Sequence, residues 1–341
     1  MVGKVAVLAS YNTGFVVYVD RLPVEGETLP GRNFRMEHGG KGSNQAIQSA
    51  KLGCRTSVVA RLGYDIFAER ALEKWRAEKI DTKHVVRDSD APTGVGVVIV
   101  GPEGRNMIVV DLGANKKLSK EDVSAAEQML SESAVVLAQL EIPIETALYG
   151  LQISDAIKIL NPAPAAQISP EQLRGLDIIT PNEVEIMTMA GKPLNMSEIV
   201  QVAEKYAKYV DNVIVTLGSE GALVVGDRGN VHVKPPRIKA VDSTGAGDAF
   251  NGALAAALSR GYDLLEAVEY ACFAGAFLTA RFKGGELVDA LPTEAELGKF
   301  ISKHADSMMY VGKRASGRSG ILPCPRQKRR NSSIRFDARR P

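Results

Sequence analysis

The fold of this 341-residue chain is decided by the stretch Ala240-Val241-Asp242-Ser243-Thr244-Gly245-Ala246-Gly247-Asp248-Ala249-Phe250-Asn251-Gly252. We predict that a strand ends near Val241, that a Gly-Ala-Gly turn follows, and that a helix of small residues then runs to Ser259. Because backbone N–H groups converge at a helix start and the helix dipole adds positive potential, this turn predicts a site for a phosphoryl group. Asp248 lies in the first helical turn and is a candidate general base for an attacking hydroxyl. Taken alone, the stretch also fits a tight turn in which Asp248 caps the helix.

A second glycine-rich stretch, His38-Gly39-Gly40-Lys41-Gly42-Ser43-Asn44-Gln45-Ala46, predicts another strand-to-helix turn. Its glycines let the backbone approach a ligand closely, and Lys41 and Asn44 supply donors where the helix starts. Alone, it is also compatible with a purely structural turn. Together with the distant Gly-Ala-Gly-Asp stretch, it indicates a ligand site.

Other phosphate-binding and catalytic motifs are excluded by their spacing. Gly40-Lys41-Gly42-Ser43 does not follow the Gly-Lys-Ser/Thr order of a Walker A loop, and Arg35 stands where its first glycine belongs. Neither Gly94-x-Gly96 nor Gly245-x-Gly247 has the third glycine of a dinucleotide-binding loop. The sequence contains no G-x-S-x-G elbow, and its histidines show no paired spacing for a metal.

Strand-like and helix-like segments alternate along most of the chain. The strand-like runs are Val5–Ser10, Thr56–Gly63, Val135–Leu140, Asp177–Thr180 and Val213–Gly218. Apolar residues recur with a helical period in Lys41–Leu52, Asp65–Lys79, Ser119–Leu130 and Ser197–Val210. This alternation predicts an α/β fold with a central, mostly parallel sheet and helices on both faces.

Two regions interrupt the alternation because they contain strand-like runs with no helix between them. They cover about 13–35 and 93–111, and Pro102-Glu103-Gly104 predicts a turn inside the second region. Strands that cannot join the main sheet in register predict a small separate β-sheet, which we expect to act as a lid.

The charge of the chain is unevenly distributed. The formal net charge is +2, but residues 311–341 hold ten Lys and Arg and one Asp, a net of +9, which leaves −7 for residues 1–310. Because the apolar periodicity ends past Ile301, we expect one domain over 1–305 and a basic, disordered tail over 306–341. A nucleic-acid or membrane-surface arm built on Arg326-Gln327-Lys328-Arg329-Arg330 is the alternative for the tail.

Cysteine spacing and hydropathy bear on the compartment. Cys54, Cys272 and Cys324 are scattered and lack C-x-x-C spacing, so they predict neither a disulfide framework nor a zinc site and suit the cytoplasm. No apolar run approaches the roughly 20 residues that cross a bilayer, so we expect no membrane span.

The two glycine-rich stretches resemble the signatures of the ribokinase, or PfkB, family of carbohydrate kinases. The resemblance runs from about Val5 to Pro292 and implies a ribokinase-like fold and a cytoplasmic, ATP- and Mg²⁺-dependent phosphotransferase that acts on an alcohol group, with K⁺ as a further candidate cofactor. Smaller matching blocks are Pro23-x-x-Gly26-Glu27-Thr28, Gly113-Ala114-Asn115, Gln139-Leu140-Glu141, Asn161-Pro162-Ala163-Pro164-Ala165, Thr180-Pro181-Asn182-Glu183-x-Glu185 and Thr216-Leu217-Gly218-Ser219-x-Gly221.

The resemblance implies a role for each matching residue. The catalytic residues would be Asp248, as general base, and Gly245, Ala246 and Gly247, which would donate hydrogen bonds to the transferring phosphate. The sugar-binding residues would be Asn12, Gly40, Lys41, Asn44, Glu141 and Asp248. The nucleotide-binding residues would be Asn182, Thr216, Gly218, Ser219, Gly221 and Gly247. Glu185 would serve Mg²⁺, and Asp242 with Thr244 would form the candidate K⁺ site.

Two of these assignments have structural alternatives. Asn182 and Glu185 lie one helical turn apart, and the alternative for them is an N-terminal cap pair. The alternative for Glu141 is a surface residue after a strand.

The sequence departs from the family pattern at two places. Gly14 stands where the family has an Asp that binds sugar hydroxyls, and losing hydrogen bonds to a charged group, worth about 1.5–3 kcal/mol each, would change sugar selection. We expect either an acceptor other than ribose held in the usual way, or another carboxylate such as Asp111 in its place. In the loop 283–289, Val288 stands near the family's serine beside the K⁺ site.

The resemblance implies transfer of the γ-phosphate of ATP to a primary hydroxyl of a pentose, ribose first. The alternatives are a nucleoside kinase or another sugar kinase of the same fold, acting on fructose or deoxyribose, and a sugar-binding regulator without catalysis. Unpaired lid edges favour a homodimer joined lid to lid. Neither a nucleic acid nor a membrane is expected as a partner of the 1–305 domain.

Overall fold

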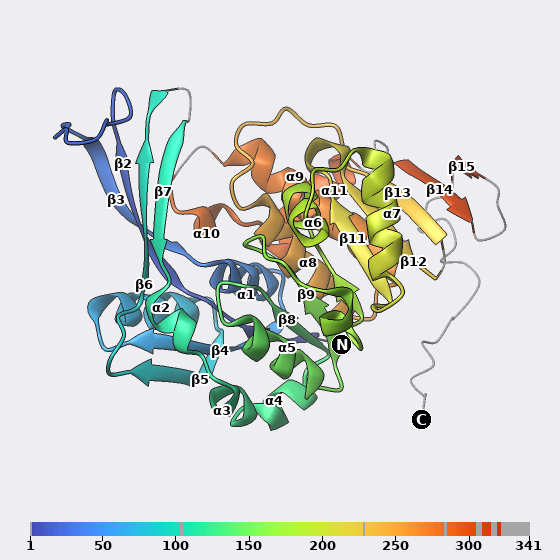
Figure 1. The fold of residues 1–341 in the computed structure, drawn as a ribbon, viewed down its shortest axis with the longest axis horizontal. Helices are drawn as coiled ribbons and strands as arrows, with labels where there is room; N and C mark the ends of the chain where they lie inside the picture. Colours follow the sequence, from blue (N-terminus) through green and yellow to red (C-terminus); the bar gives the residue numbers. More distant parts are fainter. Residues whose placement is uncertain are drawn as a thin grey trace.

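A large sheet forms the centre of the computed structural model, which describes residues 2–102, 105–227, 229–282, 285–304, 309–314 and 319–321. Its strand order is β15-β14-β13-β12-β11-β10-β9-β8-β1-β4-β5 (Figure 1). The strands are β1 (Lys4–Leu8), β4 (Arg55–Gly63), β5 (Asp81–Asp88), β8 (Val135–Ala138), β9 (Ile157–Leu160), β10 (Ile178–Ile179), β11 (Asn212–Thr216), β12 (Ala222–Gly226), β13 (Gly229–Lys234), β14 (Met309–Arg314) and β15 (Ser319–Ile321).

The neighbouring strands from β11 across β1 to β5 pair in parallel, and β11 to β15 pair antiparallel. The mostly parallel α/β sheet predicted from the sequence is therefore confirmed. In such a sheet, loops at the carboxyl ends of the parallel strands gather at one edge and supply the ligand-binding residues.

Helices cover both faces of this sheet and bury a separate apolar core on each. Along β1, Val5 and Val7 enter one core while Ala6 and Leu8 enter the other, because successive side chains of a strand point to opposite faces. On the first face lie α1 (Lys41–Lys51), α2 (Ile66–Ala77), α8 (Ala246–Ser259), α9 (Leu264–Arg281), α10 (Leu287–Ala290) and α11 (Glu294–His304). On the second face lie α3 (Lys120–Ser124), α4 (Glu127–Ser131), α5 (Ile144–Gln152), α6 (Glu183–Ala190) and α7 (Met196–Tyr206).

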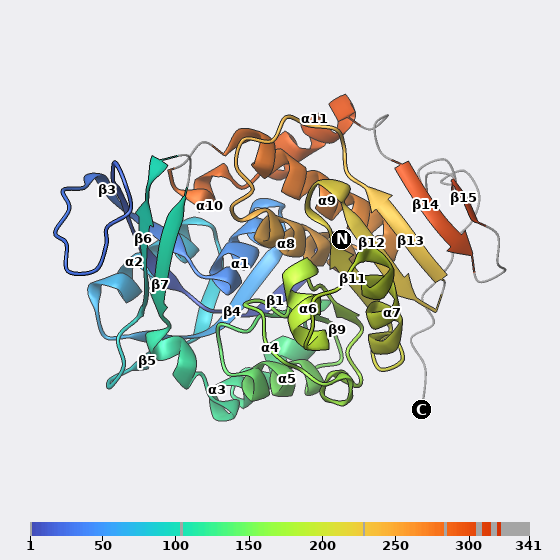
Figure 2. The ribbon, with the colours of Figure 1, turned by 45° about the horizontal axis from the view of Figure 1, so that its top comes forward.

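A second, four-stranded sheet is the predicted lid. It has the order β3-β2-β6-β7, with β2 (Asn12–Tyr18), β3 (Arg32–Gly39), β6 (Gly94–Val100) and β7 (Asn106–Asp111). The pair β2–β6 is parallel and the other two pairs are antiparallel. Figures 1 and 2 show this sheet standing upright at the left of the body, apart from the large sheet.

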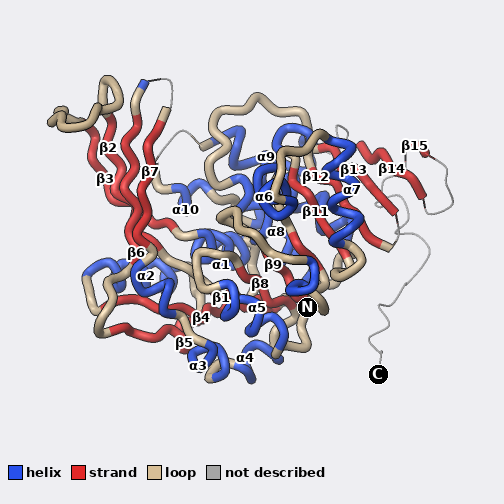
Figure 3. The backbone as a smooth tube through the Cα atoms, in the orientation of Figure 1, coloured by secondary structure: helices blue, strands red, loops and turns tan. Residues whose placement is uncertain are grey.

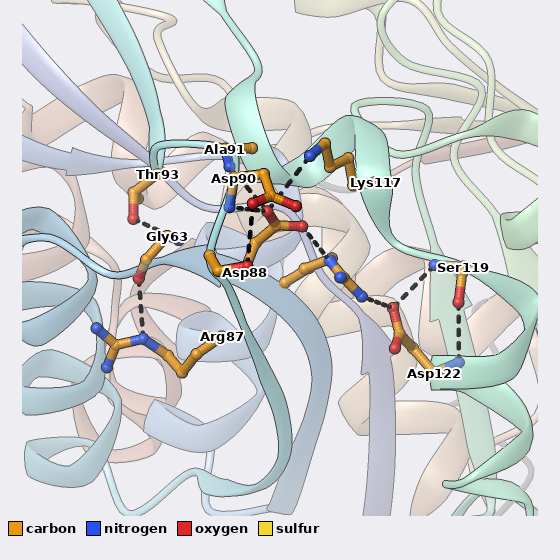
Figure 4. A network of polar contacts seen from close by, with 11 residues as sticks. Gly63, Arg87, Asp88, Asp90, Ala91, Thr93, Lys117, Ser119 and Asp122 are labelled. Carbon is orange, nitrogen blue, oxygen red and sulfur yellow. Dashed lines mark hydrogen bonds and ion pairs between the residues drawn. The ribbon is translucent and has the colours of Figure 1, made fainter.

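A buried ion-pair network fixes the chain where it enters the lid (Figure 4). Asp88, at the end of β5, is 2% exposed and accepts hydrogen bonds from Arg61 Nε (2.6 Å) and from the backbone N–H groups of Asp90 and Ala91. The other end of Arg61 donates to Asp122 (2.7 Å), and Lys117 lies 3.4 Å from Asp88. The Arg61 guanidinium holds the pKa of Asp88 far below its ordinary value. The network thus connects the segment before β6 to the segment after β7.

Most predicted elements occur with shifts of one or two residues at their ends. Three predictions differ more. Ser119–Leu130, which we predicted as one helix, divides into α3 and α4 around Ala125 and Ala126, and the helix predicted over Ser197–Val210 ends at Tyr206. The strand predicted to end near Val241 is wrong: β13 ends at Lys234, because Pro235 and Pro236 cannot donate to a strand ladder, and residues 235–245 form a connection to α8. Figure 3 shows the connecting loops in tan between blue helices and red strands, and many of the site segments described below lie at such junctions.

The basic region differs from the predicted disordered tail in two segments. β14 pairs with β13 and β15 pairs with β14, so these residues extend the antiparallel edge of the large sheet. Edge strands offer unpaired backbone groups, which explains why a polar segment can add to one. Residues 305–308, 315–318 and 322–341, including the segment 326–330, lie outside the described residues.

Cys54 and Cys272 are buried free thiols, and Cys324 lies outside the described residues. No helix within the described ranges is long and apolar enough to cross a membrane.

Candidate active site

The N-terminus of α8 forms as predicted from the Gly-Ala-Gly-Asp stretch. Gly245 is the N-cap residue and adopts the left-handed conformation with φ 72°, which a residue with a side chain rarely adopts. No side chain caps this helix, and Ala246 N donates to Ser243 O (3.1 Å). Because first-turn N–H groups lack intrahelical acceptors, those of Gly247 and Asp248 are suited to an anion.

The start of α1 packs directly against the end of β1. A Cβ on Gly40, which has φ 91°, would lie 2.7 Å from Tyr11 Cα and 2.8 Å from Ser10 O, and one on Gly42 would lie 2.4 Å from Ser10 N. Only glycine fits such approaches. They bring Lys41 and Asn44 to the carboxyl end of β1.

Asp248 is 8% exposed and is held by two amides of α1. Its Oδ2 accepts from Asn44 Nδ2 and its Oδ1 from Gln45 Nε2, both at 2.9 Å. Helices α1 and α8 approach closely because Gly252 has no side chain: a Cβ there would lie 2.6 Å from Gln45 O. Two stretches about 200 residues apart in the sequence thus meet at one carboxylate.

Gln45 belongs to a buried chain of polar side chains that the sequence analysis did not single out. Its Nε2 also donates to Asn161 Oδ1 (3.1 Å), and its Oε1 accepts from Gln139 Nε2 (2.7 Å). Asn161 donates to Thr180 O (3.0 Å), and the hydroxyl of Thr180 bonds Asn251 Oδ1 (2.6 Å). These residues are buried because β8, β9, α1 and α8 pack together. The sequence showed only that they are polar and lie inside the matching blocks, and it did not show that they contact one another.

Lys41 lies among three carboxylates. Burial lowers the pKa of Lys41, but the negative charges of Asp248, Glu141 and Glu185 together raise it above its ordinary value. The structure therefore brings predicted sugar-binding, catalytic and metal-binding residues within electrostatic range of one ammonium group.

Glu141 is partly buried and serves as the acceptor that ties three segments together. Its Oε2 accepts from Ser10 Oγ (2.6 Å) and from Lys41 N (2.7 Å), and Asn12 Nδ2 lies 3.4 Å from Oε1. Burial raises the pKa of this carboxyl. Glu141 is thus not a free surface residue, and Ser10 is a contributor that the sequence analysis did not identify.

Asn12 is fixed from the other side by Asn115. Asn115 Nδ2 donates to Asn12 Oδ1 (3.0 Å) and to Tyr11 O (2.9 Å), and Asn115 Oδ1 accepts from Tyr11 N (2.9 Å). This buried side chain orients the Asn12 amide toward Glu141.

Asn182 and Glu185 form a complete capping box at the start of α6. Asn182 Oδ1 accepts from Glu185 N (2.8 Å), and Glu185 Oε2 accepts from Asn182 N (2.8 Å). Burial raises the pKa of Glu185 to about 7, while Lys41 opposes the shift and Asp248 adds to it. The structural alternative given for this pair is therefore present, and the same carboxylate faces the charges of Lys41 and Asp248.

The loop after β11 lies beside this capping box. Thr216 forms an isolated bridge with Asn182, and its N–H donates to Pro181 O (2.9 Å). Gly218 and Gly221 have φ 52° and 90°, and Ser219 between them is exposed. Five of the six predicted nucleotide-binding residues therefore lie at two adjacent junctions, and the sixth, Gly247, lies in the first turn of α8.

Asp242 and Thr244 lie in the turn before α8, and Asp242 Oδ1 accepts from Thr244 N (2.8 Å). Helix α10 reaches the same turn, because a Cβ on Gly245 would lie 2.6 Å from Leu287 Cδ2. Residues 283 and 284 of the preceding loop lie outside the described residues. Val288 is fully buried.

The register of the lid strands corrects one expectation. Asp111 pairs with Val95, which is level with Thr13, so its side chain belongs to the opposite face of the lid from Gly14. Its Oδ1 accepts from Gly113 N (3.1 Å). The proposal that Asp111 replaces a carboxylate at Gly14 is wrong.

The chain is similar to known carbohydrate kinases over most of its length. Residues 2–291 match the pfkB family carbohydrate kinase. A ribokinase from Haemophilus influenzae is 34% identical over 304 residues, which cover 88% of this chain and 98% of that protein. A deoxyribokinase from Salmonella typhi is 33% identical over 279 residues, 80% of this chain and 91% of that protein.

A solved structure of Arabidopsis thaliana ribokinase complexed with ribose and ATP has a TM-score of 0.78 and 30% sequence identity. The match covers 88% of this chain and 99% of that chain.

Proposed function

Because this chain belongs to the pfkB family of carbohydrate kinases, we propose that it transfers the γ-phosphate of ATP to a primary hydroxyl of a pentose, with ribose as the first candidate. The observation that carries this proposal is the position of Asp248. A buried carboxylate lies in the first turn of an uncapped helix and contacts Asn44 on the helix that begins with Lys41.

In the proposed reaction the sugar hydroxyl oxygen bonds to the γ-phosphorus while the bond from that phosphorus to the bridging oxygen of ADP breaks. The hydroxyl proton passes to Asp248. The backbone N–H groups of Gly247 and Asp248 at the start of α8 would stabilise the negative charge of the transferring group, whereas that of Ala246 is bonded to Ser243 O. The lid would exclude water as a competing nucleophile.

The sugar would lie between the lid and the start of α1. Asn12, Lys41 and Glu141 surround this position, and Gly40 brings the backbone close to it. Asn44 contributes an unused acceptor, because within the described residues its buried Oδ1 has no hydrogen-bond partner. A sugar hydroxyl would satisfy that oxygen.

ATP would lie along the loops that carry Asn182, Thr216, Gly218, Ser219 and Gly221. Glu185 is the proposed residue for Mg²⁺. A single buried carboxylate fits that ion, because Mg²⁺ usually combines one or two carboxylates with substrate phosphates and water. When bound, Mg²⁺ neutralises phosphate charge.

We also propose a K⁺ site at Asp242 and the carbonyl oxygen of Thr244. Both residues lie in the turn that precedes the anion-binding helix start, where a cation would offset phosphate charge. Activity measured with K⁺ exchanged for tetramethylammonium tests this site: unchanged turnover would exclude it.

A homodimer joined through the lid is supported by the apolar face opposite Gly14. Met36, Phe15, Val97 and Val109 lie in directly paired positions across the four strands, and Val109 is 72% exposed. Exposed apolar faces of this kind mark interaction sites. Light scattering of Val109→Asp should report a monomer if the lid forms the interface, and an unchanged mass would refute it.

We propose a cytoplasmic location, which suits the buried free thiols of Cys54 and Cys272.

A panel of acceptors tests the function directly. ADP formation would be measured with ribose, 2-deoxyribose, fructose, adenosine, cytidine and inosine as acceptors. The proposal expects the highest kcat/KM for a pentose, and the deoxyribokinase relative makes 2-deoxyribose the second candidate. Preferential turnover of a nucleoside would show that the acceptor is a nucleoside and not a free sugar. Sugar binding without turnover would indicate a regulator.

A further inference from the structure

The face of the lid that looks toward Asp248 is defined by strand register. Asn12 and Gly14 on β2 lie opposite Gly39 and Glu37 on β3, and level with Gly94 and Gly96 on β6. Residues in directly paired positions project to the same face of a sheet. Since Asn12 reaches Glu141, this face is the one that covers the proposed sugar site.

Glycines leave the centre of this face bare. A Cβ added to Gly14 would meet only Glu37, with Cβ and O both at 3.7 Å, and one added to Gly96 would meet only Val110 Cγ2 at 3.8 Å. Glu37 therefore supplies the carboxyl side chain beside the bare area, two residues along β3 from Gly39, the partner of Asn12, or roughly 7 Å away.

Glu37 is held in place with acceptor capacity left over. Its side chain is 17% exposed, and Oε1 accepts from Arg35 Nε at 2.6 Å. Arg35 is itself fixed by the hydroxyl of Tyr18 (2.7 Å) and by that ring. A carboxylate has about four lone-pair sites, so Glu37 Oε2 can accept from a ligand hydroxyl while Arg35 occupies the other oxygen.

Two other carboxylates near the site also accept hydrogen bonds from the protein, and the proposed function already uses both for the sugar. Asp248 accepts from Asn44 and Gln45, and Glu141 accepts from Ser10 and Lys41 N.

We propose that Glu37 is a specificity-determining residue of the lid, whose carboxylate accepts hydrogen bonds from secondary hydroxyls of the acceptor sugar. This inference rests on the proposed sugar-kinase function and adds the residue that selects the hydroxyl pattern. The primary hydroxyl would face Asp248 while the ring hydroxyls face the lid.

The test compares Glu37→Gln with Asp111→Asn, a matched amide substitution on the opposite face of the same lid. For Glu37→Gln we expect the KM of the best sugar to rise about 10- to 100-fold, as for loss of a hydrogen bond to a charged group. The KM of ATP should stay within about twofold, and Asp111→Asn should match the wild type.

Sugars that lack one secondary hydroxyl separate recognition from a structural role. If Glu37 binds that hydroxyl, Glu37→Gln should impair the deoxy sugar much less than the parent sugar. Equal losses for the parent and for each monodeoxy analogue, or an unchanged sugar KM, would overturn the proposal.

A second variant moves the carboxylate from Glu37 to its directly paired residue on β2, Gly14. Gly14→Asp combined with Glu37→Ala should recover part of the lost sugar affinity, because Gly14 has room for a side chain and a negative φ. No recovery relative to Glu37→Ala would count against the proposal. Wild-type protein that turns over no sugar at all would refute the proposed function itself. Wild-type turnover that the Glu37 substitutions leave unchanged would refute only the role of Glu37.

Discussion

Replacing Asp248 by Asn removes the proposed base while keeping the shape of the side chain. The carboxylate accepts one hydrogen bond on each oxygen, from Asn44 and from Gln45. The amide introduced by Asp248→Asn would turn its NH₂ group toward one of these donors. Leaving one buried donor unpaired would cost about 1–3 kcal/mol.

Asn44 can relieve this conflict by turning its amide. Its Oδ1 is buried without a partner among the described residues, so a flipped Asn44 would accept from the new NH₂ group. We therefore expect the destabilisation to lie near the lower limit, about 1 kcal/mol, or about 1–2 °C in Tm for a domain of this size.

The effect on catalysis should be far larger. Loss of a general base lowers turnover by about 10²–10⁴-fold, whereas the KM of ATP should change by less than about twofold because the nucleotide loops are untouched. Steady-state kinetics and thermal unfolding would be measured on the same preparations. Asp263→Asn is the matched control, since Asp263 caps the next helix and Asn caps equally well. A kcat for Asp248→Asn within about tenfold of the wild type would refute the assignment of the base.

Other contacts of the site and of the fold give three further predictions. Because the pKa of Glu185 is raised to about 7, its carboxyl group is neutral below that pH and binds a cation poorly. The Mg²⁺ concentration that gives half-maximal activity should therefore rise about tenfold for each pH unit below 7. A concentration that does not change with pH would exclude Glu185 as the metal-binding residue. Asp88→Asn should lower the free energy of unfolding by about 2 kcal/mol at pH 7 in urea titrations. Because the pKa of Asp88 is lowered in the folded protein, its carboxylate stabilises the fold at pH values above the ordinary pKa of Asp, and this stabilisation is lost as the pH falls further. The difference in free energy of unfolding between the wild type and Asp88→Asn should therefore shrink below about pH 4. A difference that stays constant with pH would contradict the ion-pair account. Gly40→Ala should reduce kcat/KM for the sugar more than tenfold, because the added Cβ would lie 2.7 Å from Tyr11 Cα. Gly175→Ala is the control and should retain activity, because Gly175 has a similar φ of 83° but no neighbour within 4 Å. Equal effects of the two substitutions would show that backbone strain alone is responsible.

The sequence predicted what depends on local order. Gly245 and Asp248 are close in the chain, so a turn, a helix start and a carboxylate in the first turn could be inferred without knowing the rest of the fold. The parallel sheet and the lid followed in the same way from the order of strand-like and helix-like segments.

The contacts that depend on packing were out of reach of the sequence. Gln45 contacts Asp248 only because α1 and α8 approach closely at Gly252, and Ser10 contacts Glu141 only because β1 and β8 are neighbours. The prediction for Asp111 failed because a shift of one residue in strand register moves a side chain to the other face.

The product of the reaction tests the central proposal most directly. Protein incubated with ribose, ATP and Mg²⁺ would be followed by phosphorus NMR. We predict one ADP per sugar phosphate, with the phosphomonoester signal coupled to the methylene protons of the primary carbon, and loss of this product in Asp248→Asn. Release of inorganic phosphate at the same rate with and without sugar, or a phosphate on the anomeric carbon, would contradict the account.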